Sequence, residues 1–485
     1  MTTTARVLAS TISLFFLPGS VLATNGMNLE GYGPEALGMG GSSMAYDNGS
    51  AASMNNPSTI GLMEDGHRFD FAIGFLGPQV TSEFGGSKAD SSADAYYMPA
   101  LGWTSKKGPL AYGVGIFAQG GMGTEYGGTS FLSGYQDAAT GNMASSGLTN
   151  RSEVSVGRFL IPISYVINDA FVVGGSIDYV WAGMDILMQM PGAVMMDMMP
   201  GGSQSAGTIS GTLVDGLGGL MGSGGISGLN YGYFDFSDDS DFTGEASSTG
   251  FAAKLGGVYK INSQTTLGFT YHSQTSLGDL ETGNATVTMS VLGDSGVLQG
   301  QAPSGTNVTA DIPLTGTIKV KDFQWPSMYG LGVSFAASEQ LQIAADLKRI
   351  NWSQVMKDFT MEFTADNSPT NGGFGGASMT ATLYQEWEDQ TVIALGAAYK
   401  INDKLTGRVG YNYASNPIPD EYMNPLFPAI VESHLTLGAG YGLNPASDIN
   451  FALSIAPENS QTNSQNNVKS SMSQMSWQLM YSLRY

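Results

Sequence analysis

The strongest constraint on the fold is the alternation of apolar and polar side chains at the end of the chain. In the segment 475–485, MSWQLMYSLRY, every odd position is apolar, and Met480 is the only apolar residue at an even position. Successive side chains of a strand point to opposite faces, so this segment has one apolar and one polar face. Its Trp and Tyr residues favour contact with lipid, because these side chains are stable at the bilayer interface. The pattern predicts a membrane-spanning strand.

The same alternation recurs upstream. We expect strands near 68–76, 96–104, 110–119, 154–166, 171–183, 250–260, 266–275, 327–336, 341–350, 391–400, 405–413, 433–442, 448–456 and 474–485. These are about fourteen strands, an even number, as a closed single-chain barrel requires. Within 154–166 the apolar phase changes, which we interpret as a β-bulge near Gly157 and Arg158.

The connections between these segments alternate in length. Short ones such as 105–109 and 400–404 alternate with long ones, the largest at 184–249, 276–326 and 351–390. Short periplasmic turns and long exterior loops are typical of outer-membrane barrels. The sequence therefore predicts an all-β transmembrane antiparallel barrel over residues 68–485.

The first 23 residues have the form of a secretory signal peptide. Arg6 precedes an apolar run that is broken at Pro18, and the small residue Ala23 would end the signal. The chain contains no Cys, so an exported form cannot use disulfides. Its net charge of −22 argues against a nucleic-acid partner. Export, together with the predicted barrel, leads us to expect a location in the outer membrane of a Gram-negative bacterium.

Residues 24–67 lie between the signal and the first strand. They are too few for a domain with a sizeable core, yet they contain many apolar side chains that need burial. The barrel lumen is the economical place for them, so we expect a luminal plug, or hatch. An ordinary loop remains the alternative. Its centre, Asn55-Asn56-Pro57-Ser58, combines a fixed φ at proline with amide side chains that satisfy irregular backbone.

This motif, in the context SAASMNNPSTIGLM, resembles the Asn-Pro-Ala hatch motif of the FadL/TodX family of outer-membrane transporters, with Ser58 in place of Ala. Other similar stretches are GYGPEALGMGGSSMAYDN at 31–48, GGMGTEYGG at 120–128, FQWPSMYGLGVSF at 323–335, INWSQ at 350–354 and NPIPDEY at 416–422. The resemblance covers nearly the whole mature chain. It implies a fourteen-stranded barrel with an N-terminal hatch.

The resemblance also implies passive diffusion of hydrophobic molecules from the exterior, with lateral exit into the membrane through a kink in the third strand. We place that kink at Gly120 and Gly121, because glycine accepts unusual φ and ψ angles. A flexible start to the following loop is the alternative. Long-chain fatty acids are the first expected substrates, and aromatic or aliphatic hydrocarbons are the alternative.

A methionine-rich segment in the loop 184–249 is a candidate landing surface for substrate, because methionine adapts to ligands of varied shape. A short amphipathic helix follows it. Packing between loops is the alternative role. The candidate residues are Met195, Met196, Met198, Met199, Ile209, Leu213, Leu217 and Leu220.

Four basic residues on the polar faces of predicted strands could bind a fatty-acid carboxylate: Arg158, Lys254, Lys348 and Arg408. The alternative is that they pair with acids of the lumen or hatch, because buried charges need partners. The sequence offers no metal-spaced cluster, no cofactor motif and no nucleophile motif. The second class of function, an outer-membrane lipase, esterase or adhesin, has only His434 in its favour. We expect a monomeric transporter whose partners are hydrophobic small molecules and membrane lipid.

Overall fold

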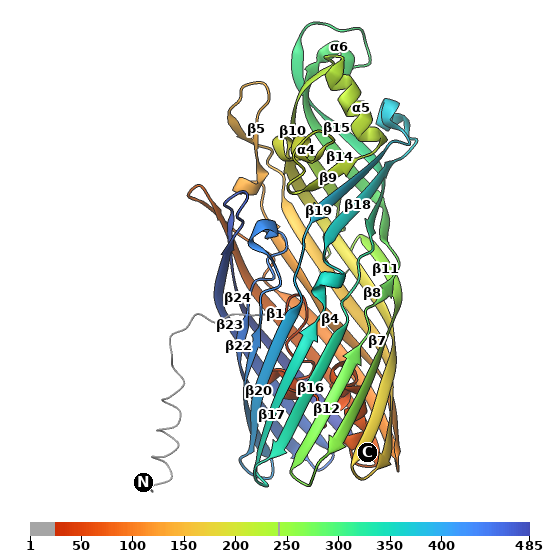
Figure 1. The fold of residues 1–485 in the computed structure, drawn as a ribbon, viewed down its shortest axis with the longest axis vertical. Helices are drawn as coiled ribbons and strands as arrows, with labels where there is room; N and C mark the ends of the chain where they lie inside the picture. The colour runs from red at the N-terminus through yellow and green to blue at the C-terminus, as the bar shows by residue number, and fades with distance from the viewer. Residues whose placement is uncertain (1–24, 241–242) are drawn as a thin grey trace.

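The computed structural model describes residues 25–240 and 243–485, so the expected signal peptide 1–23 lies outside the described residues. The chain forms an all-β closed barrel whose first and last strands pair along almost their whole length. Short turns lie at one end of the barrel and long loops at the other (Figure 1), in agreement with the sequence. Among the described residues, no helix combines the length and hydrophobicity needed to cross a bilayer.

The ring is antiparallel, and each of its long strands pairs with the one that follows it around the barrel. In that order the strands are β1 (Gly66–Phe84), β3 (Tyr96–Lys107), β4 (Leu110–Tyr126), β7 (Asn150–Asn168), β8 (Phe171–Pro191), β11 (Ala246–Lys260), β12 (Thr265–His272), β16 (Met328–Ala336), β17 (Leu341–Ile350), β20 (Gln390–Lys400), β21 (Leu405–Ala414), β22 (Ser433–Asn444), β23 (Ser447–Thr462) and β24 (Lys469–Arg484).

Two further strands, β10 (Ile226–Phe236) and β14 (Leu280–Asp294), insert between the loop-side parts of β8 and β11. Added to the fourteen strands above, they bring the ring of described strands to sixteen, so the expected number of about fourteen is two short. Towards the turn end, β8 pairs directly with β11. The alternation pattern missed the inserted strands because they lie in segments that read as long loops.

The sheet continues above the ring through these inserted strands. It extends from β14 through β15 (Asn307–Lys321), β18 (Asp358–Ala365) and β19 (Ser378–Tyr384) to β9 (Gly207–Ser210). The remaining strands are β2 (Ser87–Asp90), β5 (Gly134–Gln136), β6 (Met143–Ser145) and β13 (Ser276–Leu277). The three largest expected loops therefore form an ordered sheet above the barrel.

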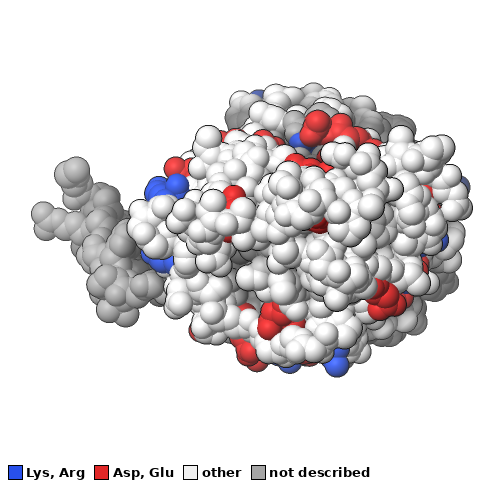
Figure 2. All heavy atoms as spheres, turned by 90° about the horizontal axis from the view of Figure 1, so that it is seen from above, with Lys and Arg blue, Asp and Glu red and all other residues white. Residues whose placement is uncertain are grey.

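Short helices lie in the connections and before the barrel. They are α2 (Pro34–Leu37), η1 (Gly49–Ala51), α3 (Ala52–Asn55), η2 (Pro57–Leu62), η3 (Phe131–Ser133), α4 (Gly192–Met198), α5 (Thr212–Gly222), α6 (Ser295–Leu298), η4 (Trp352–Gln354), η5 (Pro369–Phe374) and η6 (Asp420–Tyr422). Acidic side chains are scattered over the loop end of the molecule (Figure 2).

The strands have the alternation that the sequence predicts. Leu395, Leu437 and Leu479 are 47%, 51% and 42% exposed on the outer face, as a lipid-facing surface requires. Lys254 and His434, at positions of the opposite parity, are buried in the lumen. Polar groups in the lumen therefore meet other polar groups rather than lipid.

The polar side chains of the lumen contact the segment 25–65, which we call the N-terminal segment. Almost all of its residues are buried, and it occupies the turn-side part of the barrel (Figure 1). Its backbone is held by the wall: the Ser43 amide donates to Asp346 Oδ2 at 2.7 Å, and the Lys348 ammonium donates to the Gly41 carbonyl at 2.7 Å. The Ser50 amide donates to a carboxylate of β1. The lumen at this level is therefore filled by protein.

Candidate functional site

The barrel wall is split between β3 and β4. These strands pair from the turn end only as far as Leu101 and Ile116. Beyond that point β3 continues its pairing with β1 up to Tyr96, and β4 continues with β7 up to Tyr126. The two strands therefore separate in the loop-side half of the wall and leave a gap that faces the membrane.

A bulge in β4 lies beside this gap. The register of β4 against β7 shifts between Ala118 and Gly120, which leaves Gln119 as an extra residue. Gly120 has a φ of 155°, and a Cβ there would overlap the carbonyl oxygen of Met27. A side chain at this position is therefore excluded by the N-terminal segment.

The bulge expected near Gly157 and Arg158 lies in the partner strand: the register shift at Gly157 leaves the extra residue in β4, and β7 itself pairs with β8 without interruption from Arg151 to Val166. The apparent change of phase has another cause. Val154 and Val156 have the same parity as Arg158 and are 2% exposed, so they face the interior although they are apolar. An apolar inner face at this level of β7 indicates an apolar cavity on the interior side of the barrel wall.

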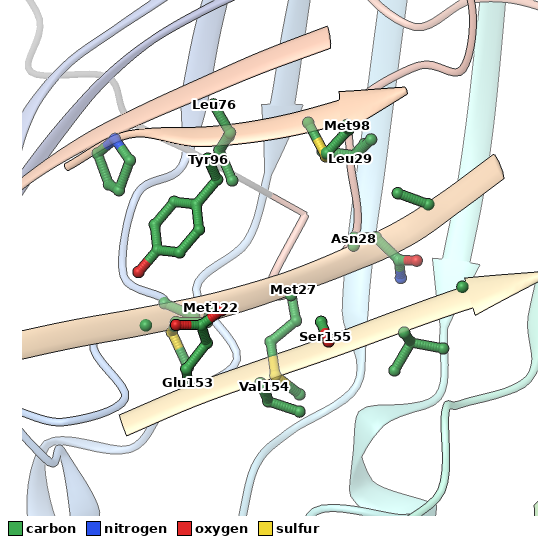
Figure 3. Close-up of a pocket in the computed structure, with 18 of the residues that line it drawn as sticks. Met27, Asn28, Leu29, Leu76, Tyr96, Met98, Met122, Glu153, Val154 and Ser155 are labelled. Atoms are coloured by element: carbon green, nitrogen blue, oxygen red, sulfur yellow. The ribbon is translucent and has the colours of Figure 1, made fainter. Parts of the chain in front are cut away.

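That cavity has a volume of about 300 Å³ and passes through the gap. From the interior it is lined by Met27, Leu29, Val154, Val156 and Met472, and from the membrane side by Tyr97, Ile116 and Trp181. Figure 3 shows Leu76, Tyr96 and Met98 along one side and Met122, Glu153, Val154 and Ser155 along the other, with Met27 to Leu29 between them. We call it the wall pocket. It connects the barrel interior to the lipid-facing surface.

The membrane-side mouth of the wall pocket is aromatic. Tyr97 is 51% exposed and Trp181 is 38% exposed. The indole of Trp181 lies across Gly157, where any Cβ would overlap the ring. The absence of a side chain at Gly157 thus allows the indole of Trp181 to lie beside the mouth.

Glu153 is the one formally charged residue among the described residues that line the wall pocket. Its side chain is only 10% exposed and forms an ion pair of 2.9 Å with Arg151. Lys, Arg and His are absent from the lining residues that the structure describes. The wall pocket thus offers an anionic ligand no cation.

Asn28 closes the inner side of the wall pocket. Its Oδ1 accepts hydrogen bonds from Gln119 Nε2 at 2.7 Å and from Trp325 Nε1 at 2.8 Å. Its backbone forms a β-bridge with Gly120, and the Gly121 amide donates to the Met27 carbonyl at 3.2 Å. The start of the N-terminal segment is therefore joined to the bulge of β4.

The four motif residues Asn55 to Ser58 lie deeper in the N-terminal segment. Asn55 Nδ2 donates to the Tyr32 carbonyl at 2.9 Å, and Asn56 Nδ2 donates to the Met44 carbonyl at 2.7 Å. Pro57 begins η2, and Asn56 Oδ1 accepts from the amide and hydroxyl of Ser58 at 3.2 and 2.7 Å. The motif therefore joins separate turns of the segment and does not line the wall pocket.

Two of the four candidate carboxylate partners share one acid. Arg158 is paired with Asp178 at 2.8 Å, and the Lys254 ammonium contacts the same carboxylate. All three side chains are at most 2% exposed. These cations compensate a buried acid, which is the alternative role considered from the sequence.

The other two candidates bind the N-terminal segment. Lys348 donates to the Gly41 carbonyl, and Arg408 pairs with Glu35 at 3.3 Å and donates to Asn450 Oδ1 at 2.9 Å. None of the four cations lines the wall pocket. Lys348 and Arg408 contact the N-terminal segment, whereas Arg158 and Lys254 pair with Asp178 of β8.

The residues expected to form a landing surface are mostly interior. Those that are at most 2% exposed are Met195, Met198, Ile209, Leu213 and Leu217, whereas Met199 and Leu220 are partly buried and Met196 is 49% exposed. Ile209 lies in β9 rather than in the helix α5 that contains the leucines. In this conformation their contacts are those of packing between loops, the alternative role.

His434 does not support the enzyme alternative. Its Nε2 lies 2.6 Å from Glu30 Oε1, and both side chains are buried. The Ser454 hydroxyl donates to Glu30 Oε1, whereas a catalytic triad would need the histidine beside the serine. No metal-binding group of three acidic, His or Cys side chains is found among the described residues.

Sequence reasoning missed the residues that line the wall pocket. Tyr96, Glu153 and Trp181 come from three strands, and Met27 from the segment before the barrel. The apolar parity of Val154 and Val156 is the one available signal, and in the sequence it resembles the phase change of a bulge.

A comparison with known proteins identifies the family to which this chain is related. Residues 20–482 match the family described as outer membrane protein transport protein (OMPP1/FadL/TodX). The chain also matches a curated protein of Chlorobium limicola, described as an uncharacterized protein in the phosphoenolpyruvate carboxykinase gene 5' region. The two are 42% identical over 99 residues, and the match spans 20% of this chain and only 48% of that protein.

Solved structures of similar proteins cover almost the whole chain. The Pseudomonas putida toluene transporter TodX is 30% identical over 95% of this chain and 100% of its own, with a TM-score of 0.77. The Ralstonia pickettii toluene transporter TbuX is 30% identical over 94% and 99% of the two chains, with a TM-score of 0.73. A Pseudomonas aeruginosa FadL homologue shares the fold at 14% identity over 94% and 99%, with a TM-score of 0.65. The chain belongs to the OMPP1/FadL/TodX family of outer-membrane transport proteins, and not to a family of enzymes.

Proposed function

We propose that this protein takes up small neutral hydrophobic molecules, monoaromatic hydrocarbons first among them, and releases them into the outer membrane through the wall pocket. The observation that carries the proposal is the apolar cavity that joins the barrel interior to the lipid-facing surface where β3 and β4 separate. An apolar molecule in that cavity needs no new opening in the wall to reach lipid.

Hydrocarbons are favoured over long-chain fatty acids by the chemistry of the wall pocket. A fatty-acid carboxylate would need a cation or several donors in such a dry site. The described lining residues include Glu153 and no basic residue, and the four candidate cations are engaged elsewhere. The solved relatives of about 30% identity are toluene transporters, which supports the same preference.

The N-terminal segment is proposed to act as the hatch of this passage. Its residues Met27 and Asn28 contact Gly120 and Gly121 at the bulge of β4. The kink proposed at these glycines coincides with the register shift in β4. Displacement of Met27 and Asn28 from the bulge would enlarge the wall pocket on its inner side.

The test compares uptake of two labelled substrates by a Gram-negative host that lacks its own hydrocarbon and fatty-acid transporters. Cells that produce this protein are expected to take up radiolabelled toluene faster than cells with the empty vector, and to gain little for radiolabelled palmitate. A larger gain for palmitate than for toluene would instead favour long-chain fatty acids as the substrates. No gain with either compound would refute transport of both classes. Oligomeric state, proposed to be monomeric, is measured by light scattering of the detergent-solubilised protein.

A further inference from the structure

The charge at the wall pocket is more negative than its single lining acid suggests. Arg151, which pairs with Glu153, also lies 3.7 Å from Glu125 and 3.7 Å from Asp239. Asp185 stands directly opposite Glu153 in the pairing of β7 with β8. Glu153 therefore shares this guanidinium with acids that do not line the wall pocket, and the group of described side chains carries a formal net negative charge.

The position of Glu153 brings this charge to the substrate. It lines the wall pocket on β7 two residues before Ser155, which lines it on the same face of the strand (Figure 3). The interior part of the lining, with Met27, Val154 and Val156, is apolar and buried, so the charge is poorly screened on that side. A second negative charge in this cavity would be repelled, whereas a neutral ring would be accepted.

We infer that Glu153 makes the wall pocket selective by charge: it excludes carboxylates, so aromatic and aliphatic substrates pass only as neutral molecules. This inference rests on the proposed route through the wall pocket. It adds a named residue and a rule for which substrates pass, since an aromatic acid and its parent hydrocarbon fit the same space and differ only in charge.

The experiment measures initial uptake of radiolabelled toluene and radiolabelled 4-methylbenzoate at pH 7 in the same host. The two probes share a ring and a methyl group, and only the second carries a negative charge. In Glu153→Gln, 4-methylbenzoate uptake is expected to rise at least about tenfold over wild type, because repulsion between two charges about 5 Å apart in a poorly screened site exceeds that factor. Unchanged 4-methylbenzoate uptake in a correctly folded Glu153→Gln protein would overturn the inference.

Two further variants keep the test independent of Arg151 and of folding failure. Ser155→Lys leaves Glu153 in place and adds a cation on the same face of β7, and it is expected to raise 4-methylbenzoate uptake as well. Glu125→Gln removes an acid beside Arg151 that does not line the wall pocket and is the matched control. A rise with Glu125→Gln equal to that with Glu153→Gln would refute a role specific to Glu153.

The two proposals fail in different ways. Toluene uptake by wild type no faster than by the empty vector would refute the proposed function. The inference about Glu153 is judged by 4-methylbenzoate uptake alone, in Glu153→Gln and Ser155→Lys relative to wild type. Heat-modifiable migration of the barrel on gels verifies that each variant is folded.

Discussion

Replacing Asn28 by leucine is expected to loosen the contact between the N-terminal segment and β4. The Asn28 side-chain carbonyl accepts from Gln119 Nε2 and Trp325 Nε1, and all three residues are buried. Leucine has a similar size but offers no acceptor, so the indole N–H of Trp325 and one of the two amide N–H groups of Gln119 lose their acceptor, while the other still donates to Tyr32. A buried donor without a partner costs about 1–3 kcal/mol, so the variant is expected to lose about 2–6 kcal/mol of local stability.

The assay is hydrogen exchange of the Gly121 amide, which donates to the Met27 carbonyl across this contact. Exchange that follows local opening accelerates about tenfold for each 1.4 kcal/mol, so the low end of the range predicts about a 30-fold increase. Asn25→Leu is the matched control, because Asn25 is equally buried in the same segment and its Oδ1 has no hydrogen-bond partner. Equal exchange in wild type and Asn28→Leu would show that Asn28 does not hold the segment to β4.

Three further substitutions test other parts of the account. Gly157→Val displaces Trp181 from the mouth of the wall pocket and is expected to lower toluene uptake several-fold; unchanged uptake, with unchanged indole fluorescence, would contradict the packing. Asp178→Asn leaves two buried cations without their acid and is expected to destabilise the barrel by about 3–5 kcal/mol, measured as the loss of the folded band in urea. Four backbone amides of the exterior loop lower the pKa of Asp294 to about 2 from its ordinary 3.8. Its stabilising effect is therefore complete above pH 4 and is lost as the pH falls through about 2. Amide exchange in residues 295–306, compared with Asp294→Asn, should converge with the variant only at that low pH.

The barrel was largely predictable because its outer surface imposes one simple condition. Each strand must present apolar side chains to lipid at every second position, and Leu395 and Leu437 satisfy it as expected. The strands β10 and β14 stand above that region, where no lipid enforces the pattern, and their segments read as loops. The strand count was therefore short by this pair.

The candidate site was less predictable because its position depends on where β3 and β4 stop pairing with each other. The register of β4 shifts between Ala118 and Gly120, beside the glycines at 120 and 121 at which the sequence predicts a kink. The separation of β3 from β4 beyond Leu101 and Ile116 leaves no mark of its own in either strand. Tyr96 and Glu153 meet at the wall pocket only through this separation, so neither could be singled out beforehand.

For the charged residues, the sequence predicts the position of the side chain but not the group that it binds. Arg158 and Lys254 lie on the luminal faces that their parity predicts. Parity gives the face of the strand but not the partner, and both cations pair with Asp178 from β8. A basic residue in a lumen is therefore a poor indicator of an anionic substrate when a neighbouring strand supplies an acid.

The most direct test of the central claim is toluene uptake after deletion of Gln119. This residue is the extra one in β4, so its removal should restore the register with β7 and close the separation from β3. The control Gln119→Ala keeps the bulge and removes only the side chain. If substrate leaves through the wall, uptake falls to the empty-vector rate in the deletion and persists in Gln119→Ala. Undiminished uptake by a folded deletion variant would contradict a lateral exit and would point to a route along the barrel axis.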